Sequence, residues 1–473
     1  MPLRILFVPF GSEGDVNPLL WLAEGMAARG HEPTFLITPH YGRLVQQHGF
    51  PWAPIGTEEE FVRFARDPRV WHPKQGTKMV VQGMLETLPA YREGFAMAGH
   101  DFDLVVLSSM AMGAASVAEA KGIPRFTLHM QPVLFRSIYD CPVFMEELSW
   151  LARSPRWVKR FFFGLVDVLF WETARKPLNA FRRGMDLPPL RNFYTEAFHG
   201  AEGVAALFPE WFAPPQPDWP PEVRQFGFPV AICLPRPLPE SLEAFLGSGD
   251  PPVAWTHGSA NFDIQHFQSR ALAVSQELKL RCLLISLDPP EGPLPTGAFH
   301  IAHARFEDLF PRCRAVVHHG GIGTTAKCIV AGAPQLIIPR SHDQPDNASR
   351  IVKLGLGETL SYRRIDSADL SVTLRKLLAS KTATSRCREF QTRVLAANTL
   401  PEVCDWAEEI ARQLTFPTRR RCFGAMRRLL LLLACSGFLS ASAFAGSCGG
   451  CGEKNKEGEK GQDSTKQSLA VVL

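Results

Sequence analysis

One glycine-rich turn carries the amides and side chains best suited to hold a diphosphate. Apolar residues 315–317 lead into the run His318-His319-Gly320-Gly321-Ile322-Gly323-Thr324-Thr325. A strand over 315–319 is expected to end in this turn and to open a helix, so that several backbone N–H groups point into one space. A helix N-terminus carries about half a positive charge, which favours a bound phosphate. His319 and Thr324 add side-chain donors at the same place.

Two further polar residues follow the next expected strand. Asp343 offers hydrogen-bond acceptors, and Gln344 offers an amide with both donors and an acceptor. This combination suits the hydroxyl groups of a sugar, so the two sets together favour a nucleotide-sugar site. The glycine turn alone is weak evidence, because such turns open helices in many α/β proteins.

A second glycine turn lies near the N-terminus, in Gly11-Ser12-Glu13-Gly14-Asp15-Val16-Asn17-Pro18. Two interpretations of Asp15 compete. It caps a helix N-terminus, or it faces a cleft and takes the proton of an acceptor hydroxyl as general base. An aspartate with its ordinary pKa of about 4 is a weak base, and desolvation would raise that pKa.

The elements that would position these groups alternate between strands and helices in both halves of the chain. This alternation favours parallel sheets covered on both faces. A helix is expected to begin at Asn17-Pro18 and to end at Gly30. Strands are expected over residues 4–9, 34–38, 103–108 and 125–129, and again over 253–256, 281–287, 315–319 and 335–339.

The ordered set His-His-Gly-Gly-x-Gly-Thr-Thr, Ala-Gly-x-Pro-Gln-Leu-x-x-Pro and His-Asp-Gln-x-Asp-Asn-Ala lies within residues 315–357. It resembles the C-terminal signature of bacterial GT-B glycosyltransferases of the UDP-glycosyltransferase group (family 28 N-terminal or family 1 type). The group includes rhamnosyltransferases, sterol glucosyltransferases, and macrolide and glycopeptide glycosyltransferases. The resemblance implies an α/β chain with two Rossmann-like parallel-sheet domains that face each other across a cleft.

The resemblance also implies a domain plan. Residues 1–234 would form the acceptor-binding domain, 235–252 a Pro-rich linker, and 253–415 the domain that binds the nucleotide sugar. A helix around 401–413 would cross back toward the first domain. The tail, 416–473, would lie outside the catalytic fold.

As the resemblance implies, the enzyme would move a hexose from a UDP- or dTDP-sugar to a hydroxyl of a lipid-like or natural-product acceptor. The reaction would invert the anomeric centre and need neither metal nor other cofactor. Asp15 would activate the acceptor. The residues expected to bind the nucleotide sugar are Gly258, Ser259, His319, Gly320, Gly321, Gly323, Thr324, Asp343 and Gln344.

Two segments, 67–74 and 207–220, look like the rhamnosyltransferase branch, and a role as structural loops of the first domain is preferred for both. The chain also departs from its relatives. Phe306-Glu307-Asp308-Leu309-Phe310-Pro311 lacks the Trp that often stacks on the base, which leaves the choice of nucleotide open. His257 replaces the more usual Phe or Gln before Gly258-Ser259.

Composition sets the outer bounds. The 473 residues carry a net charge of only +4, so no nucleic-acid partner is implied. The cysteines up to Cys404 are single and widely spaced, which indicates reduced thiols in a cytoplasmic protein. No cluster with zinc spacing precedes residue 440, and the pair Asp101-Phe102-Asp103 is interpreted as solvated turn carboxylates.

Two apolar segments have competing interpretations. Residues 157–171 form a core helix of the first domain, or else the wall of an acceptor pocket or a helix at a membrane interface. Residues 426–445 look like a signal peptide and are followed by a polar stretch. A fused reading frame, a C-terminal membrane anchor and a small metal or disulfide motif remain open for the tail, so contact with the inner face of the plasma membrane also stays open.

Other functions remain as alternatives. A nucleotide-sugar epimerase of the same fold would consume donor without an acceptor, and a non-catalytic subunit would only bind it. A dinucleotide-dependent oxidoreductase is disfavoured, because Gly11-Ser12-Glu13-Gly14 lacks the third glycine of its fingerprint and no acidic residue ends the second strand.

Overall fold

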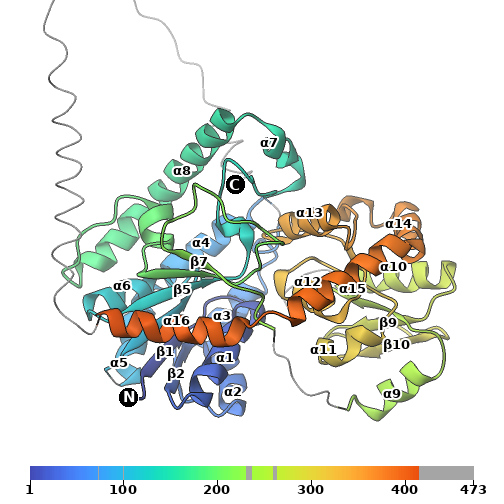
Figure 1. Cartoon of the computed structure of the whole chain (residues 1–473), viewed down its shortest axis with the longest axis horizontal. Helices are drawn as coiled ribbons and strands as arrows, with labels where there is room; N and C mark the ends of the chain where they lie inside the picture. Colours follow the sequence, from blue (N-terminus) through green and yellow to red (C-terminus); the bar gives the residue numbers. More distant parts are fainter. Residues whose placement is uncertain (73, 100, 231–236, 259–263, 415–473) are drawn as a thin grey trace, which may run out of the picture.

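The computed structural model describes residues 1–72, 74–99, 101–230, 237–258 and 264–414 (Figure 1). Within these residues the chain forms two parallel sheets, each flanked by helices. Between them they carry every strand that the sequence predicts. The α/β expectation is therefore confirmed.

The first sheet has the strand order β3-β2-β1-β4-β5-β6-β7, and all its neighbours are parallel. Its strands are β1 Arg4–Val8, β2 Glu32–Ile37, β3 Trp52–Pro54, β4 Leu104–Ser108, β5 Arg125–His129, β6 Gly203–Ala206 and β7 Val223–Gln225. Its helices are α1 Glu13–Ala28, α2 Pro39–Gln47, α3 Glu58–Ala65, α4 Gly76–Glu86, α5 Leu88–Ala98, α6 Met112–Ala120, α7 Ser149–Arg153 and α8 Arg156–Arg183.

The second sheet has the order β10-β9-β8-β11-β12-β13, again parallel throughout. Its strands are β8 Val253–Thr256, β9 Cys282–Ile285, β10 Ala298–Ile301, β11 Ala315–His318, β12 Gln335–Ile337 and β13 Gly357–Thr359. The helices are α9 Glu240–Gly247, α10 Ile264–Glu277, α11 Phe306–Leu309, α12 Ile322–Ala331, α13 Gln344–Leu354, α14 Asp369–Ala379, α15 Lys381–Leu395 and α16 Thr399–Leu414.

The side chains of β1 point alternately into two hydrophobic clusters, one on each face of the sheet. Ile5 and Phe7 belong to the cluster that includes α1 and α16, whereas Leu6 and Val8 belong to the cluster beneath α5 and α6. Successive side chains of a strand point to opposite faces, so a strand that is apolar throughout requires cover on both sides. The run of apolar residues in β1 therefore accounts for helices on both faces of this sheet.

The first helix begins earlier than the sequence predicts. We expected it to start at Asn17-Pro18, but α1 begins at Glu13 and holds Pro18 inside it. Ser12 is the residue before the helix, and its N–H donates to Asp15 Oδ2 at 2.9 Å. This local carboxylate bond stabilises the first turn enough to place the start ahead of the proline. The predicted end is confirmed, because the chain turns at Gly30 with a φ of +84°.

The last helix returns to the first sheet. α16 packs against α1 and β5, and Figure 1 shows it lying along the N-terminal half of the molecule. Arg29 Nη1 pairs with Asp405 at 2.6 Å and with Glu408 at 3.0 Å. The expected crossing back toward the first domain is confirmed.

Part of the expected linker is structured. α9 lies inside residues 235–252, and its Leu242 and Leu246 are buried in the core beneath β8 and β9. Of the described helices, none is long and apolar enough to cross a membrane.

Candidate functional site

One large cleft of about 2310 Å³ runs between the two sheets and is lined by residues of both. The loops that follow β1, β8, β11 and β12 all reach it. The carboxyl ends of parallel strands meet at one edge of a sheet, which is where open α/β sheets bind ligands. Both glycine turns singled out in the sequence therefore face the same space.

The turn after β11 is held in shape by His318. The N–H of Gly320 donates to His318 Nδ1 at 3.1 Å, and His318 Nε2 in turn lies 3.0 Å from Gln335 Oε1. Gly320 has a φ of +95°, and a Cβ there would lie 2.6 Å from Ile337 Cγ2. Gly320 is buried and its amide is already engaged by His318, so the residue shapes the turn, and its expected contact with the donor stays a prediction.

The remaining residues of the turn do line the cleft. Gly321 precedes α12, and Gly323 and Thr324 belong to its first turn, where no intrahelical carbonyl is available to their amides. His319 stands beside them with a buried Nδ1 that has no hydrogen-bond partner. Burial lowers the pKa of His319 well below its usual value, and His318 and His257 add to this effect. His319 is therefore a neutral hydrogen-bond donor.

Asp343 and Gln344 open α13 on the same wall. Asp343 Oδ2 accepts from the Ile322 amide at 3.2 Å and from Asn347 Nδ2 at 2.7 Å. Burial raises the pKa of Asp343 to about 6 against these hydrogen bonds, which lower it. Gln344 Oε1 accepts from the Arg340 amide at 2.8 Å, which leaves the NH₂ end of its carboxamide as the available one. Asp343 thus joins the turn before α13 to the N-terminus of α12.

Asp15 stands on the opposite wall, in α1. Its Oδ2 accepts from the N–H and Oγ of Ser12 at 2.9 and 3.2 Å. Gly11, with a φ of +120°, makes room for this carboxylate, because a Cβ there would lie 2.3 Å from Oδ2. Burial raises the pKa of Asp15 to about 6, Ser12 lowers it, and the charge of Asp343 raises it further. The Asp15 carboxylate therefore caps α1 and also lines the cleft, and its role as general base stays a prediction.

Gly258 also lines the cleft, with a φ of +82° after β8. Its N–H lies 3.4 Å from Thr256 Oγ1. Ser259, the other expected donor on this loop, lies outside the described residues.

The sequence analysis examined residues 306–311 for an aromatic residue that stacks on the base, but it did not expect residues 302–305 after β10 to line the cleft. Residues 302–307 line it, together with Leu287 and Lys327. Phe306 stacks on Phe310 at 4.4 Å between ring centroids, and Lys327 Nζ lies 5.3 Å from the Phe306 ring. The signal was weak because β10 is a half-buried edge strand without a continuous apolar run.

An apolar wall completes the cleft on the side of the first domain. Phe162, Phe163, Val166 and Phe170 of α8 line it. Phe163 and Val166 are also buried in the fold, whereas Trp157 and Phe161 are 73% and 72% exposed. The helix interpretation of residues 157–171 is confirmed, and the same helix is both a core element and a pocket wall.

The segment 67–74 also reaches across the cleft. Trp71 Nε1 donates to the Ala65 carbonyl at 3.0 Å, a bond within the first domain. His342 Nε2 lies 3.0 Å from the Val70 carbonyl, and His342 has a φ of +58° next to Asp343. The segment therefore contacts the turn that precedes Asp343.

Six cysteines in the described residues are free, among them Cys282, Cys313 and Cys328, as predicted. Within the same residues, no group of three His, Cys, Asp or Glu side chains is arranged to hold a metal ion.

Comparison with known proteins connects both halves of the chain to sugar transfer. Residues 5–140 match the glycosyltransferase family 28 N-terminal domain, and residues 288–410 match the erythromycin biosynthesis protein CIII-like C-terminal domain.

Two curated relatives are 29% identical to the chain. Glycosyltransferase GtfC of Amycolatopsis orientalis is matched over 76% of this chain and 86% of the relative. O-mycaminosyltylonolide 6-deoxyallosyltransferase of Streptomyces fradiae is matched over 86% and 98%.

A solved glycosyltransferase of Streptomyces sp. SF2575, complexed with thymidine diphosphate, shares the fold. Its TM-score is 0.58 at 18% identity, and the match covers 86% of this chain and 99% of that one. With two domain matches, curated relatives and a shared architecture, the chain has the GT-B fold and is a glycosyltransferase enzyme.

Proposed function

We propose that this enzyme transfers a hexose from a UDP- or dTDP-sugar to a hydroxyl group of an apolar acceptor, with inversion of the anomeric carbon. One observation carries the proposal. A carboxylate with a pKa raised to about 6, Asp15, stands across one cleft from the N-terminus of α12 and the Asp343 turn. A base facing an anion-binding helix is the arrangement that a direct displacement at a sugar diphosphate requires.

The diphosphate of the donor would lie on the amides of Gly321, Gly323 and Thr324. Neutral His319 would donate a hydrogen bond from its ring, and the N-terminus of α12 would supply the positive potential. The sugar would then contact Asp343 and Gln344. The thymidine diphosphate bound to the Streptomyces sp. SF2575 enzyme supports a nucleoside diphosphate as the leaving group.

The proposed chemical step is a single displacement. The acceptor oxygen forms a bond to the anomeric carbon while the bond from that carbon to the diphosphate oxygen breaks. The electron pair leaves with the nucleoside diphosphate, and the hydroxyl proton passes to Asp15. Attack from the face opposite the leaving group inverts the anomeric configuration.

The acceptor would rest on the apolar wall of α8. Phe162, Phe163, Val166 and Phe170 offer it aromatic and aliphatic surface, beside the Arg136–Asp167 ion pair that also lines the cleft. A lipid-like or polycyclic hydroxyl compound fits such a wall better than a free sugar does. Contact with a membrane surface would follow from an acceptor of this kind.

A panel of nucleotide sugars tests the proposal. The enzyme is incubated with UDP-, dTDP- and GDP-hexoses, with and without lipid-like hydroxyl acceptors, and nucleoside diphosphate release is measured. Release that depends on acceptor, with a product of inverted configuration by NMR, is expected. Release without any acceptor would indicate epimerase chemistry, and binding without release would indicate a non-catalytic subunit.

A further inference from the structure

The outer face of α8 exposes aromatic side chains that the cleft does not use. Trp157 and Phe161 are 73% and 72% exposed, and Trp150 on α7 is 52% exposed. Trp157, Phe161 and Val168 lie at spacings of four and seven residues, which places them on one stripe of the helix. Figure 1 shows α7 and the N-terminal half of α8 standing out from both sheets. Several large apolar side chains exposed on neighbouring helices mark a candidate interaction site.

Around Trp157 and Phe161, the charged residues of the same chain segment are all basic. Residues 148–166 contain no Asp or Glu but hold Arg153, Arg156, Lys159 and Arg160. Lys159 is buried and donates to the Ile138 carbonyl at 3.4 Å. The other three are exposed, and the Arg156 guanidinium lies 4.4 Å from the Tyr139 ring. The surface therefore combines aromatic rings with exposed cations.

Of the three acidic side chains that flank residues 148–166, two are already paired with arginines, and the third, the exposed Glu146, accepts from the Ser361 hydroxyl. Asp167 accepts from Arg136 Nη2 at 2.6 Å on the cleft side of α8. Glu147, in the turn before α7, forms an ion pair with Arg363 of the second domain. These carboxylates are engaged elsewhere and do not neutralise the exposed arginines.

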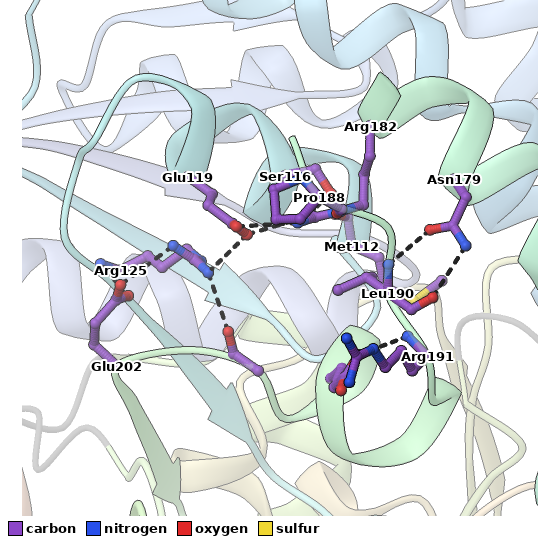
Figure 2. A network of polar contacts seen from close by, with 12 residues as sticks. Met112, Ser116, Glu119, Arg125, Asn179, Arg182, Pro188, Leu190, Arg191 and Glu202 are labelled. Carbon is purple, nitrogen blue, oxygen red and sulfur yellow. Dashed lines mark hydrogen bonds and ion pairs between the residues drawn. The ribbon is translucent and has the colours of Figure 1, made fainter. Parts of the chain in front are cut away.

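The other end of α8 is fixed firmly to the first sheet, as Figure 2 shows. Arg182 forms two bonds of 3.0 Å to the carboxylate of Glu119 on α6. Arg125 of β5 contacts the same carboxylate at 3.3 Å. Asn179 holds the following chain through the N–H and C=O of Leu190, at 2.9 and 3.0 Å. This network sets the direction in which the aromatic stripe points.

We propose that α7 and the N-terminal half of α8 bind the surface of an anionic phospholipid bilayer. The docking surface comprises Trp150, Arg153, Arg156, Trp157, Arg160 and Phe161. Trp and Phe side chains insert at the level of the headgroups, and exposed arginines are attracted to anionic lipids. Each such cation strengthens binding about fivefold.

The two faces of α8 then have related roles. The outer face rests on the bilayer, while Phe162, Phe163 and Val166 of the inner face line the cleft. A hydroxyl lipid leaving the bilayer would meet this apolar wall first. This delivery role rests on the proposed function, but binding to the bilayer does not, because vesicle binding needs neither donor nor transfer.

Vesicle sedimentation of the full chain tests the proposal. Binding to phosphatidylcholine vesicles is compared with binding to vesicles containing about 30% phosphatidylglycerol, at low and high salt. We expect the wild type to prefer the anionic vesicles at least tenfold and to lose that preference at high salt. W157S/F161S should weaken binding at least tenfold, and R153Q/R160Q should remove most of the preference for anionic lipid.

Matched controls come from α14 and α15. Val372 and Leu395 are exposed apolar side chains, and Lys381 and Arg388 are exposed cations. V372S/L395S and K381Q/R388Q should bind vesicles as the wild type does. Circular dichroism and dTDP binding check that each variant is folded.

Three results would overturn the proposal. The first is that the wild type does not bind anionic vesicles. The second is that the α8 variants bind them as the controls do, in which case another part of the chain is responsible. In the third, W157S/F161S converts a wild-type dimer to monomer in solution without affecting vesicle binding, which would make the stripe a contact between two copies.

Discussion

At the scale of single residues, the site depends on two carboxylates whose pKa values are both raised to about 6 by burial. They face each other across the cleft, and the charge of Asp343 adds to the rise at Asp15. Within the described residues, Asp343 accepts hydrogen bonds from the Ile322 amide and from Asn347, whereas those to Asp15 come from Ser12. Asp15 is therefore the better placed of the two to accept a proton.

Replacing Asp15 with Asn should separate binding from chemistry. The amide keeps the shape of the side chain but cannot accept the proton, so we expect kcat to fall about 100- to 10,000-fold. The dissociation constant of dTDP, measured by calorimetry, should change by no more than about twofold. Transfer at the wild-type rate in Asp15→Asn would remove this residue from the mechanism.

The pH dependence follows from the same raised pKa. Above pH 6 Asp15 is ionised and can act as a base, and below about pH 6 it is protonated and cannot. We therefore expect kcat/KM to fall by about tenfold or more per pH unit on the acid side. The residual rate of Asp15→Asn should fall less steeply, because one of the two titrating carboxylates is gone. A wild-type rate that is constant from pH 5 to 7 would contradict this.

At the scale of elements, the turn between β11 and α12 determines which amides reach the cleft. His318 takes the Gly320 amide, and Asp343 takes the Ile322 amide, so Gly321, Gly323 and Thr324 are left to a ligand. The conformation that leaves these three amides available depends on the left-handed backbone of Gly320 and on the lack of a side chain there. The turn is thus a rigid element, and a small change in it should alter donor binding.

A pair of glycine variants tests this rigidity. Gly30 and Gly320 both have positive φ, but only at Gly320 would a Cβ meet neighbours, at 2.6 Å from Ile337. Gly30→Ala should cost about 1 kcal/mol of unfolding free energy, from backbone strain alone. Gly320→Ala should cost about 1–3 kcal/mol more and should weaken dTDP binding. Equal losses in urea unfolding and unchanged binding would show that the turn tolerates the side chain.

At the scale of the whole molecule, the two sheets are joined by polar contacts as well as by α16. Arg350 of α13 bonds to Asp346 at 2.8 Å on its own helix and to Asp140 of the first domain at 2.9 Å. Asp346 also accepts from the Val143 amide at 3.1 Å. These contacts join α13 of the second domain to the segment between β5 and α7 of the first domain.

Replacing Arg350 with Ala should break its ion pairs with Asp140 and Asp346 and lower the stability of the fold. Arg350→Ala leaves Asp346 as a buried carboxylate without its cation, and we expect a loss of about 3 kcal/mol in unfolding free energy. Arg363→Ala is the matched control, because Arg363 also pairs across the domains but its side chain is 72% exposed. That variant should lose less than about 1 kcal/mol. Similar losses in both variants would show that the Arg350 contact is no stronger than a surface pair.

The sequence by itself determined the strands that precede the two glycine turns and the resemblance to a family, because both are visible in short runs of residues. It did not predict the short strands β3, β6, β7, β10 and β13. Apolar runs and glycine turns specify strands such as β5 and β8 at the predicted residues, and the signature between residues 315 and 357 identified the glycosyltransferase group. A local contact also explains why α1 begins before the predicted Asn17-Pro18. The hydrogen bond from the Ser12 N–H to Asp15 stabilises a helical turn ahead of the proline.

Only the tertiary structure decided which residues meet. Asp15 and Asp343 are far apart in the chain, and their approach depends on how two separate sheets pack. The same packing buries Gly320, brings residues 302–307 into the cleft, and gives α8 one face toward the cleft and another toward solvent. Periodicity along a helix shows that an apolar stripe exists, but only the neighbours supplied by the fold decide whether that stripe is covered.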